Sequence, residues 1–238
     1  MLGRFLEVSV ATADARASLE FYESLGFSQA LVGDVRDHAY AVVSDGRLCL
    51  GLHQREMPSP TLTWVRSDLA RHAGDLLALG IELLRTQLDD ESFHELEFED
   101  PAGQAVSLIE ARTFSPPAEA AARESQLGYF EEIGIPTPDL GRSSAFWESL
   151  GLVTFDPEER PFPKVVAAAS GINVGLYDSD LGRPVLTFSH PELGQQIAML
   201  RERGHRFLDR LPRGLEPRTN AILVAPEGTW LLLTQAAD

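Results

Sequence analysis

Two glutamates occupy the same place in a repeated segment, and they are the side chains of this sequence best suited to chemistry. Glu7 and Glu132 each lie two residues after a phenylalanine and five residues before a threonine, in a short apolar stretch. A carboxylate on an apolar wall is unfavourable unless it is paired or solvated. In a cavity, such a group can anchor a ligand, bind a divalent cation, or act as an acid or base when burial raises its pKa. Glu7 and Glu132 are therefore the candidate catalytic residues.

The segment around each glutamate belongs to a gapless repeat. Residues 5–27 return as residues 130–152, with 10 of the 23 aligned positions identical. A spacing of 125 residues is the size of a domain and is too long for a solenoid unit. The sequence therefore predicts a tandem of two related domains, at residues 1–112 and 128–238. The Pro-rich segment 113–127 is the predicted linker.

A weaker repeat inside each domain predicts a further subdivision. Leu62-Thr63-Trp64 reappears as Leu186-Thr187-Phe188, and each triplet precedes a helical stretch that ends at a glycine. Asp14 and Asp139 are placed to cap the first helix of each domain. Each half-domain then reads as a strand, a helix and about three more strands. The prediction is an α+β protein of four βαβββ modules.

Composition and charge limit the possible partners. The chain has 238 residues, 44% of them hydrophobic, and a formal net charge of −16. A surface this acidic repels nucleic-acid phosphates and anionic membranes. The single cysteine, Cys49, fits a reducing compartment, and neither a signal peptide nor a membrane-spanning run is evident. We expect a cytoplasmic protein, monomeric or homodimeric, that binds neither nucleic acid nor membranes.

The leading blocks carry a resemblance to a known family. Each combines a strand that ends in Thr-x-Asp with a helix that bears Phe-Tyr or Phe-Trp and closes in Leu-Gly, and Asp100-Pro101-Ala102-Gly103 forms a glycine turn. This combination resembles the vicinal oxygen chelate superfamily, the group of glyoxalases, bleomycin-resistance proteins and extradiol dioxygenases. The resemblance implies two cupped, eight-stranded mixed sheets with helices outside and a ligand inside. It implies no single reaction, because members include isomerases, dioxygenases, thiol transferases and proteins that sequester a drug.

The resemblance also implies where metal ligands would lie. One ligand position corresponds to Glu7 and Glu132, where the metal enzymes of the family usually carry a histidine. The other positions, four residues past each turn glycine and at the start of the second module, carry no His, Asp, Glu or Cys; they are Leu50, Ser107, Gly175, Leu232, Thr61, Thr63, Val185 and Thr187. One carboxylate per cup does not make a catalytic metal site. We therefore expect no metal and no other cofactor.

Strand parity predicts which side chains face the cups. With Glu7 inward, Ser9 and Ala11 also face inward, and the same counting makes Cys49 and His53 point away from the first cup. The residues predicted to line the first cup are Glu7, Ser9, Thr61, Thr63, Leu48, Leu50, Leu52, Ala105, Ser107 and Ile109. Those predicted for the second cup are Glu132, Asn173, Gly175, Tyr177, Thr187, Trp230, Leu232 and Thr234. Both sets are typical of a small organic-ligand pocket.

Three functions remain open at this point. The first is a metal-independent protein that binds or sequesters a small organic molecule. The second is a lyase, isomerase or epimerase that acts on a small carbonyl compound, with Glu7 or Glu132 as acid/base. The third is an interaction module with vestigial cups. The predicted ligand-binding residues are Glu132, Asn173, Tyr177 and Trp230 in the second cup, expected to be the working one, and Glu7, Thr63 and Ser107 in the first.

Overall fold

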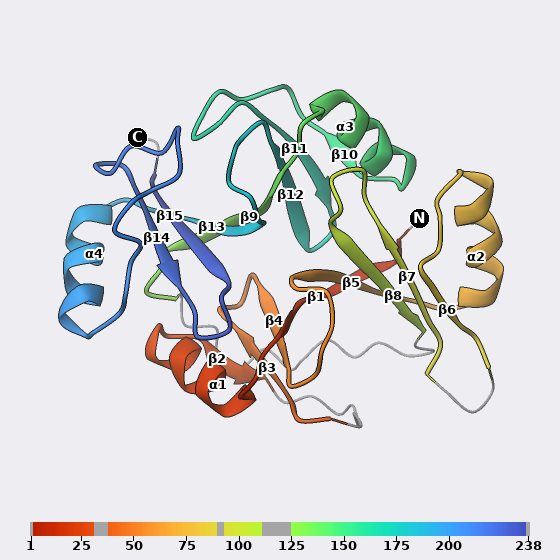
Figure 1. Cartoon of the computed structure of the whole chain (residues 1–238), viewed down its shortest axis with the longest axis horizontal. Coiled ribbons are helices and arrows are strands. Elements are labelled where there is room, and N and C mark those ends of the chain that lie inside the picture. The colour runs from red at the N-terminus through yellow and green to blue at the C-terminus, as the bar shows by residue number, and fades with distance from the viewer. Residues whose placement is uncertain (1, 31–37, 90–92, 111–124, 237–238) are drawn as a thin grey trace.

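Over the residues that the structure describes, the chain forms two mixed β-sheets with four helices at the periphery (Figure 1). This computed structural model describes residues 2–30, 38–89, 93–110 and 125–236. The first sheet has eight strands, in the order β2-β3-β4-β1-β5-β8-β7-β6, and the second has seven, in the order β10-β11-β12-β9-β13-β15-β14. Parallel and antiparallel pairs occur in both sheets. The predicted α+β architecture is confirmed.

The elements follow the predicted modules along the chain. In the first sheet the elements are β1 (Arg4–Ala11), α1 (Ala15–Ser24), β2 (Ser28–Ala30), β3 (Tyr40–Ser44), β4 (Cys49–His53), β5 (Thr61–Arg66), α2 (Leu69–Ala78), β6 (Arg85–Gln87), β7 (Glu95–Glu99) and β8 (Ala105–Glu110). In the second they are β9 (Tyr129–Pro136), α3 (Leu140–Ser149), β10 (Val153–Thr154), β11 (Lys164–Ala169), β12 (Ile172–Tyr177), β13 (Val185–His190), α4 (Leu193–Glu202), β14 (Asn220–Val224) and β15 (Trp230–Gln235). Most of the predicted linker lies outside the described residues. No described helix is long and apolar enough to cross a membrane.

The second sheet differs from the prediction of eight strands. In its fourth module, the place of an outer strand is taken by a single bridge between Phe207 and Leu223. The segment that follows contains Pro212, Gly214 and Pro217. Proline removes a backbone donor, so this segment is unsuited to extend a strand ladder.

Strand pairing fixes how the modules combine, which the repeat alone left open. Glu7 of β1 pairs with Thr63 of β5, and Glu132 of β9 pairs with Thr187 of β13. Modules one and two therefore share one sheet, and modules three and four share the other. The two glutamates occupy equivalent positions in the two sheets.

The first helix of each domain begins and ends where the sequence predicts. The Asp14 carboxylate accepts hydrogen bonds from the backbone N–H groups of Arg16 (3.0 Å) and Ala17 (3.1 Å), and Asp139 caps α3 through Arg142 in the same way. These bonds satisfy N–H groups that have no partner inside the helix. Gly26 follows α1 with a φ of 91°, a left-handed conformation that glycine adopts without strain.

The two domains share a continuous core. Trp147 of α3 is fully buried, lies 6.2 Å from the ring of Trp64 in the first domain, and donates its indole N–H to Asp100 (3.1 Å). On the opposite side, Tyr22 of α1 donates its hydroxyl to Glu227 of the second domain (2.7 Å). Each leading helix therefore packs against the other domain. Tyr22 and Trp147 are core residues, and Phe21 and Phe146 are partly buried against the same core.

Candidate functional site

Glu7 lies at the centre of a hydrogen-bonded cluster in the first cup. Its side chain is buried, and its Oε1 accepts hydrogen bonds from Ser9 Oγ (2.8 Å) and from a ring nitrogen of His53 (2.8 Å). The Tyr40 hydroxyl donates to Oε2 at 2.6 Å. Ser9 Oγ also lies 2.8 Å from Thr63 Oγ1. Three strands thus contribute donors to one carboxylate, and β5 adds a further hydroxyl.

The position of His53 corrects the parity predicted for β4. Ser9 pairs with Gly51, so Gly51 and His53 face the cup, whereas Leu50 and its neighbours Leu48 and Leu52 face the core under the helices. A side chain at position 51 would meet the Glu7 carboxylate, since a Cβ built there lies 2.1 Å from Oε1. Only glycine therefore leaves room for the carboxylate at this crossing point.

The place of the glycine in the turn explains why the counting failed. The two hairpins have equal length, because Val42 pairs with Gly51 in the first domain as Val166 pairs with Gly175 in the second. Gly46 stands one position earlier in its turn than Gly171 does, so counting from the glycine is off by one residue, which reverses the face of every later side chain. The first turn is held by the Asp45 carboxylate, which accepts the backbone N–H groups of Arg47 (2.9 Å) and Leu48 (2.8 Å).

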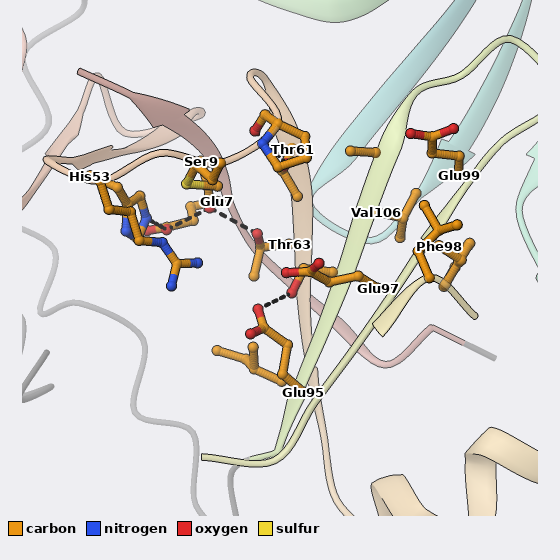
Figure 2. A pocket seen from close by; sticks show the side chains of 17 residues that line it. Glu7, Ser9, His53, Thr61, Thr63, Glu95, Glu97, Phe98, Glu99 and Val106 are labelled. Atoms are coloured by element: carbon orange, nitrogen blue, oxygen red, sulfur yellow. Dashed lines mark hydrogen bonds and ion pairs between the residues drawn. The ribbon is translucent and has the colours of Figure 1, made fainter. Parts of the chain in front are cut away.

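The opposite wall of the first cup carries further carboxylates. Glu95, Glu97 and Glu99 alternate along β7, paired with Ile109, Ser107 and Ala105 of β8. Figure 2 shows Glu95 and Glu97 on the far side of Thr63 from Glu7 and His53. These three residues were not among those predicted for the cup, although their period of two on a strand was the signal that could have revealed them.

Two glutamates of this wall, Glu95 and Glu97, have polar partners of their own. Ser107 Oγ donates to Glu95 at 2.8 Å. Arg85 Nη1 lies 3.8 Å from Glu95 and 3.7 Å from Glu97, with its own side chain half-exposed. Thr63 and Ser107, both predicted ligand-binding residues, lie in the first cup with Glu7.

These residues enclose a small cavity of about 40 Å³. That volume accommodates roughly three water molecules, so it admits a small head group in this conformation. Seven of the ten residues predicted for the first cup line it, while Leu48, Leu50 and Leu52 do not. The lining residues are Glu7, Ser9, His53, Arg55, Met57, Pro58, Thr61, Thr63, Leu84, Glu95, Glu97, Phe98, Glu99, Ala105, Val106, Ser107 and Ile109.

The pKa values of two carboxyl groups in this cavity, Glu7 and Glu97, shift in opposite directions. Burial alone would raise the pKa of Glu7, but hydrogen bonds from His53, Tyr40 and Ser9 and the charge of His53 together hold it below its usual value. Burial and the neighbouring Glu95 carboxylate raise the pKa of Glu97. Glu7 is therefore ionised and accepts hydrogen bonds near neutral pH, and the raised pKa that would suit it as a base is not found.

The second cup is occupied by its own side chains. Glu132 is buried and accepts hydrogen bonds from Lys164 Nζ (2.6 Å) and the Tyr177 hydroxyl (2.8 Å). Burial and the Glu132 carboxylate raise the pKa of Tyr177 well above its usual value. An apolar cluster fills the space around this pair; its buried members are Phe162, Tyr177, Leu181, Val185, Leu215, Ile222 and Leu232.

The predicted residues of the second cup are only partly brought together. Tyr177 contacts Glu132, and Trp230 packs against the apolar cluster, where its ring lies 5.0 Å from the Arg183 guanidinium. Asn173 is exposed and donates to the backbone oxygen of Glu131 (3.1 Å). The amide that was expected to orient a ligand beside Glu132 is therefore at the surface.

Comparisons with known proteins identify the fold. No protein-family model matches the sequence, and no curated protein is detectably similar to it. Among solved structures, the 2,3-dioxygenase LapB from Pseudomonas sp. KL28 superposes with a TM-score of 0.63 and 16% identity, covering 100% of this chain and 94% of that one. Homoprotocatechuate 2,3-dioxygenase from Brevibacterium fuscum gives a TM-score of 0.64 and 15% identity, covering 100% of this chain and 72% of that one. The chain has the two-domain fold of the vicinal oxygen chelate superfamily.

The residues present do not fit the metal that this fold family implies. With the register corrected, the position taken as Leu50 is Gly51, and the other positions in the first cup are Thr63 and Ser107. Among the described residues, no three His, Cys, Asp or Glu side chains converge as a metal site would require. Glu7 also has both oxygens engaged by protein donors. We therefore derive no step through a metal.

The lowered pKa of Glu7 predicts how stability changes with pH. A carboxyl whose folded pKa lies below the unfolded value, 4.5, stabilises the fold above that value, and the contribution is lost as pH falls through the folded pKa. Glu7→Gln is expected to lower the free energy of unfolding by about 2 kcal/mol at neutral pH. Urea denaturation from neutral to acidic pH should show this difference shrinking. A difference that grows on acidification contradicts the assignment.

Proposed function

We propose that the chain binds a small organic molecule in its first cup, without a divalent metal. The observation that carries the proposal is the ionised Glu7 carboxylate at a cavity, held by donors from three strands. Concave sites with a few fixed polar groups on otherwise apolar walls are the usual form of ligand pockets. The equivalent space in the second cup is taken up by an ion pair and apolar side chains, which disfavours it as the working site.

The lining favours a ligand that presents hydrogen-bond donors or positive charge. Four glutamates line the cavity against one arginine, Arg55. Ionised carboxylates only accept hydrogen bonds, so a ligand placed among them must donate. Repulsion between Glu95 and Glu97, which contributes to the raised pKa of Glu97, is relieved by a cation between them.

A charge-matched set of fragments tests this proposal. Benzylamine, benzyl alcohol and benzoate each contain one phenyl ring and differ in charge. The binding of each is followed by protein-observed NMR. Benzylamine is expected to bind most tightly. Glu7→Gln should weaken it by about tenfold or more, which corresponds to 1.4 kcal/mol.

Trp230→Ala is the matched control in the second cup. It is expected to leave benzylamine affinity unchanged, since Trp230 lines the other cup. Loss of binding in Trp230→Ala with retention in Glu7→Gln would place the ligand in the second cup. Failure of all three fragments to bind counts against the proposed function itself.

An acid/base enzyme is the second candidate. The observation in its favour is that Glu7 contacts both an imidazole and a phenol, groups able to exchange protons with it. Such an enzyme would be a lyase, isomerase or epimerase that acts on a small carbonyl compound. The lowered pKa makes Glu7 a weak base, so binding remains the function that the geometry supports best. An interaction module draws support only from the filled second cup.

A further inference from the structure

A line of three titratable side chains leads away from the first cup. Glu7 is 1% exposed and its Oε1 lies 2.8 Å from His53 Nε2; His53 is itself 3% exposed. The other ring nitrogen of His53, Nδ1, lies 3.0 Å from His38 Nε2. His38 is only partly buried. The line therefore joins a buried carboxylate at the cavity to a partly exposed histidine.

The ionised carboxylate fixes the protons along this line. Glu7 can only accept hydrogen bonds, so His53 must carry a proton on Nε2. When the His53 ring is neutral, Nδ1 is an acceptor and His38 donates to it from Nε2; when the ring is charged, Nδ1 donates and His38 accepts. In both states His53 links Glu7 to His38.

Three described groups beside this line, Tyr40, Ser9 and Cys49, keep their own protons. Tyr40 donates to the other oxygen of Glu7 and also stacks beside His53, with ring centroids 4.5 Å apart. Ser9 contributes only a hydroxyl to Glu7. Burial raises the pKa of the Cys49 thiol, with a smaller contribution from Glu7, so the thiol stays protonated.

The second cup provides an internal comparison. Tyr177 occupies the place of His53, since it pairs with Lys164 as His53 pairs with Tyr40. Burial and the Glu132 carboxylate raise the pKa of Tyr177, so the phenol stays protonated. Burial lowers the pKa of Lys164, but the Glu132 and Glu158 carboxylates outweigh burial and raise it, so the ammonium stays charged. Neither group exchanges protons readily near neutral pH. The first cup alone, of the two, contains a line of imidazoles.

We propose that Glu7, His53 and His38 form a path along which a proton moves between the first cup and the surface. Protonated His38 gives its Nε2 proton to His53 Nδ1, and His53 gives its Nε2 proton to Glu7. One N–H bond is broken and one formed on His53, one N–H bond is broken on His38, and one O–H bond forms on Glu7. The charges of His38 and Glu7 cancel, and no oxidant or reductant is needed.

The path goes beyond the proposed binding function. It suits a ligand that takes or gives up a proton at Glu7, such as a small molecule with an acidic O–H, or a C–H next to a carbonyl. Glu7 would exchange that proton with the ligand, and the histidines would restore its protonation state from solvent.

Hydrogen exchange at His53 tests the path without any ligand. In the full chain labelled with ¹⁵N-histidine, NMR measures how fast the Nε2 proton of His53 exchanges with water. His38→Gln is expected to slow this exchange by roughly tenfold or more, because glutamine can donate to Nδ1 but does not relay a proton at neutral pH. His205→Gln, a variant in the second domain outside the line, is the control and should leave the rate unchanged.

Two results overturn the proposal. One is an exchange rate at His53 that His38→Gln leaves unchanged, which means that exchange occurs by local opening. The other is a ¹⁵N spectrum that places the His53 proton on Nδ1. His38→Asn replaces His38→Gln if that variant does not fold. Because no fragment is present, failure here leaves benzylamine binding unaffected, and failure of the fragment screen leaves the exchange result standing.

Discussion

Replacement of Lys164 by methionine is expected to lower the free energy of unfolding by about 3–5 kcal/mol. The Lys164 ammonium lies 2.6 Å from Glu132, and the two side chains are 10% and 3% exposed. Removing the lysine leaves a buried carboxylate with a phenol as its remaining side-chain partner, at 2.8 Å from Tyr177. Methionine keeps the length and apolar stem of the side chain, so the loss reports on charge. Urea or guanidinium denaturation at neutral pH measures it.

A double variant separates the ion pair from packing. Lys164→Met combined with Glu132→Leu removes both charges, and it is expected to recover most of the stability that the single change loses. A loss below about 1 kcal/mol in the single variant would indicate a solvated pair. Benzylamine binding should be unchanged in Lys164→Met, since the pair lies in the cup that the ligand does not use.

The repeat made the architecture predictable because it fixes equivalent positions without reference to any contact. The alignment makes Glu7 and Glu132 equivalent, and the strand register confirms that each pairs with a threonine on the neighbouring strand. Helix caps and turn glycines are likewise local features, determined within a few residues of sequence. These parts of the fold could be derived from the sequence for that reason.

The interior of the cups was less predictable because it depends on strand register and distant packing. The predicted parity of β4 came from counting after Gly46, which stands one position earlier in its turn than Gly171 does, and the observed register therefore places His53 in the cup. Nothing local to the second cup indicated that Phe162 and Leu215, on separate connecting segments, would fill it. The partner of Glu132 was equally distant, since Lys164 lies 32 residues away in sequence.

Replacement of Trp147 by alanine is expected to lower the free energy of unfolding by about 3–5 kcal/mol. Trp147 is fully buried, its ring contacts Trp64 of the other domain, and its indole N–H is bonded to the buried Asp100. Alanine leaves a cavity at the contact between the domains and removes a donor from Asp100. Guanidinium denaturation measures the loss, and Phe155→Ala, at a 57% exposed aromatic of the same domain, should change stability by less than about 0.5 kcal/mol.

Trp147→Phe tests whether this loss belongs to the contact between the domains. Phenylalanine fills most of the space but cannot donate to Asp100, so a loss of about 1–3 kcal/mol is expected from the unsatisfied carboxyl alone. Because the apolar core is continuous across both domains, unfolding followed by tryptophan fluorescence and by circular dichroism should give coincident transitions in the parent chain and in Trp147→Phe. Two separated transitions in the parent chain would mean that the domains unfold independently, and Trp147 would then stabilise only its own domain. Coincidence instead means that α3, carried by the second domain, helps to hold the sheet on which the first cup is built.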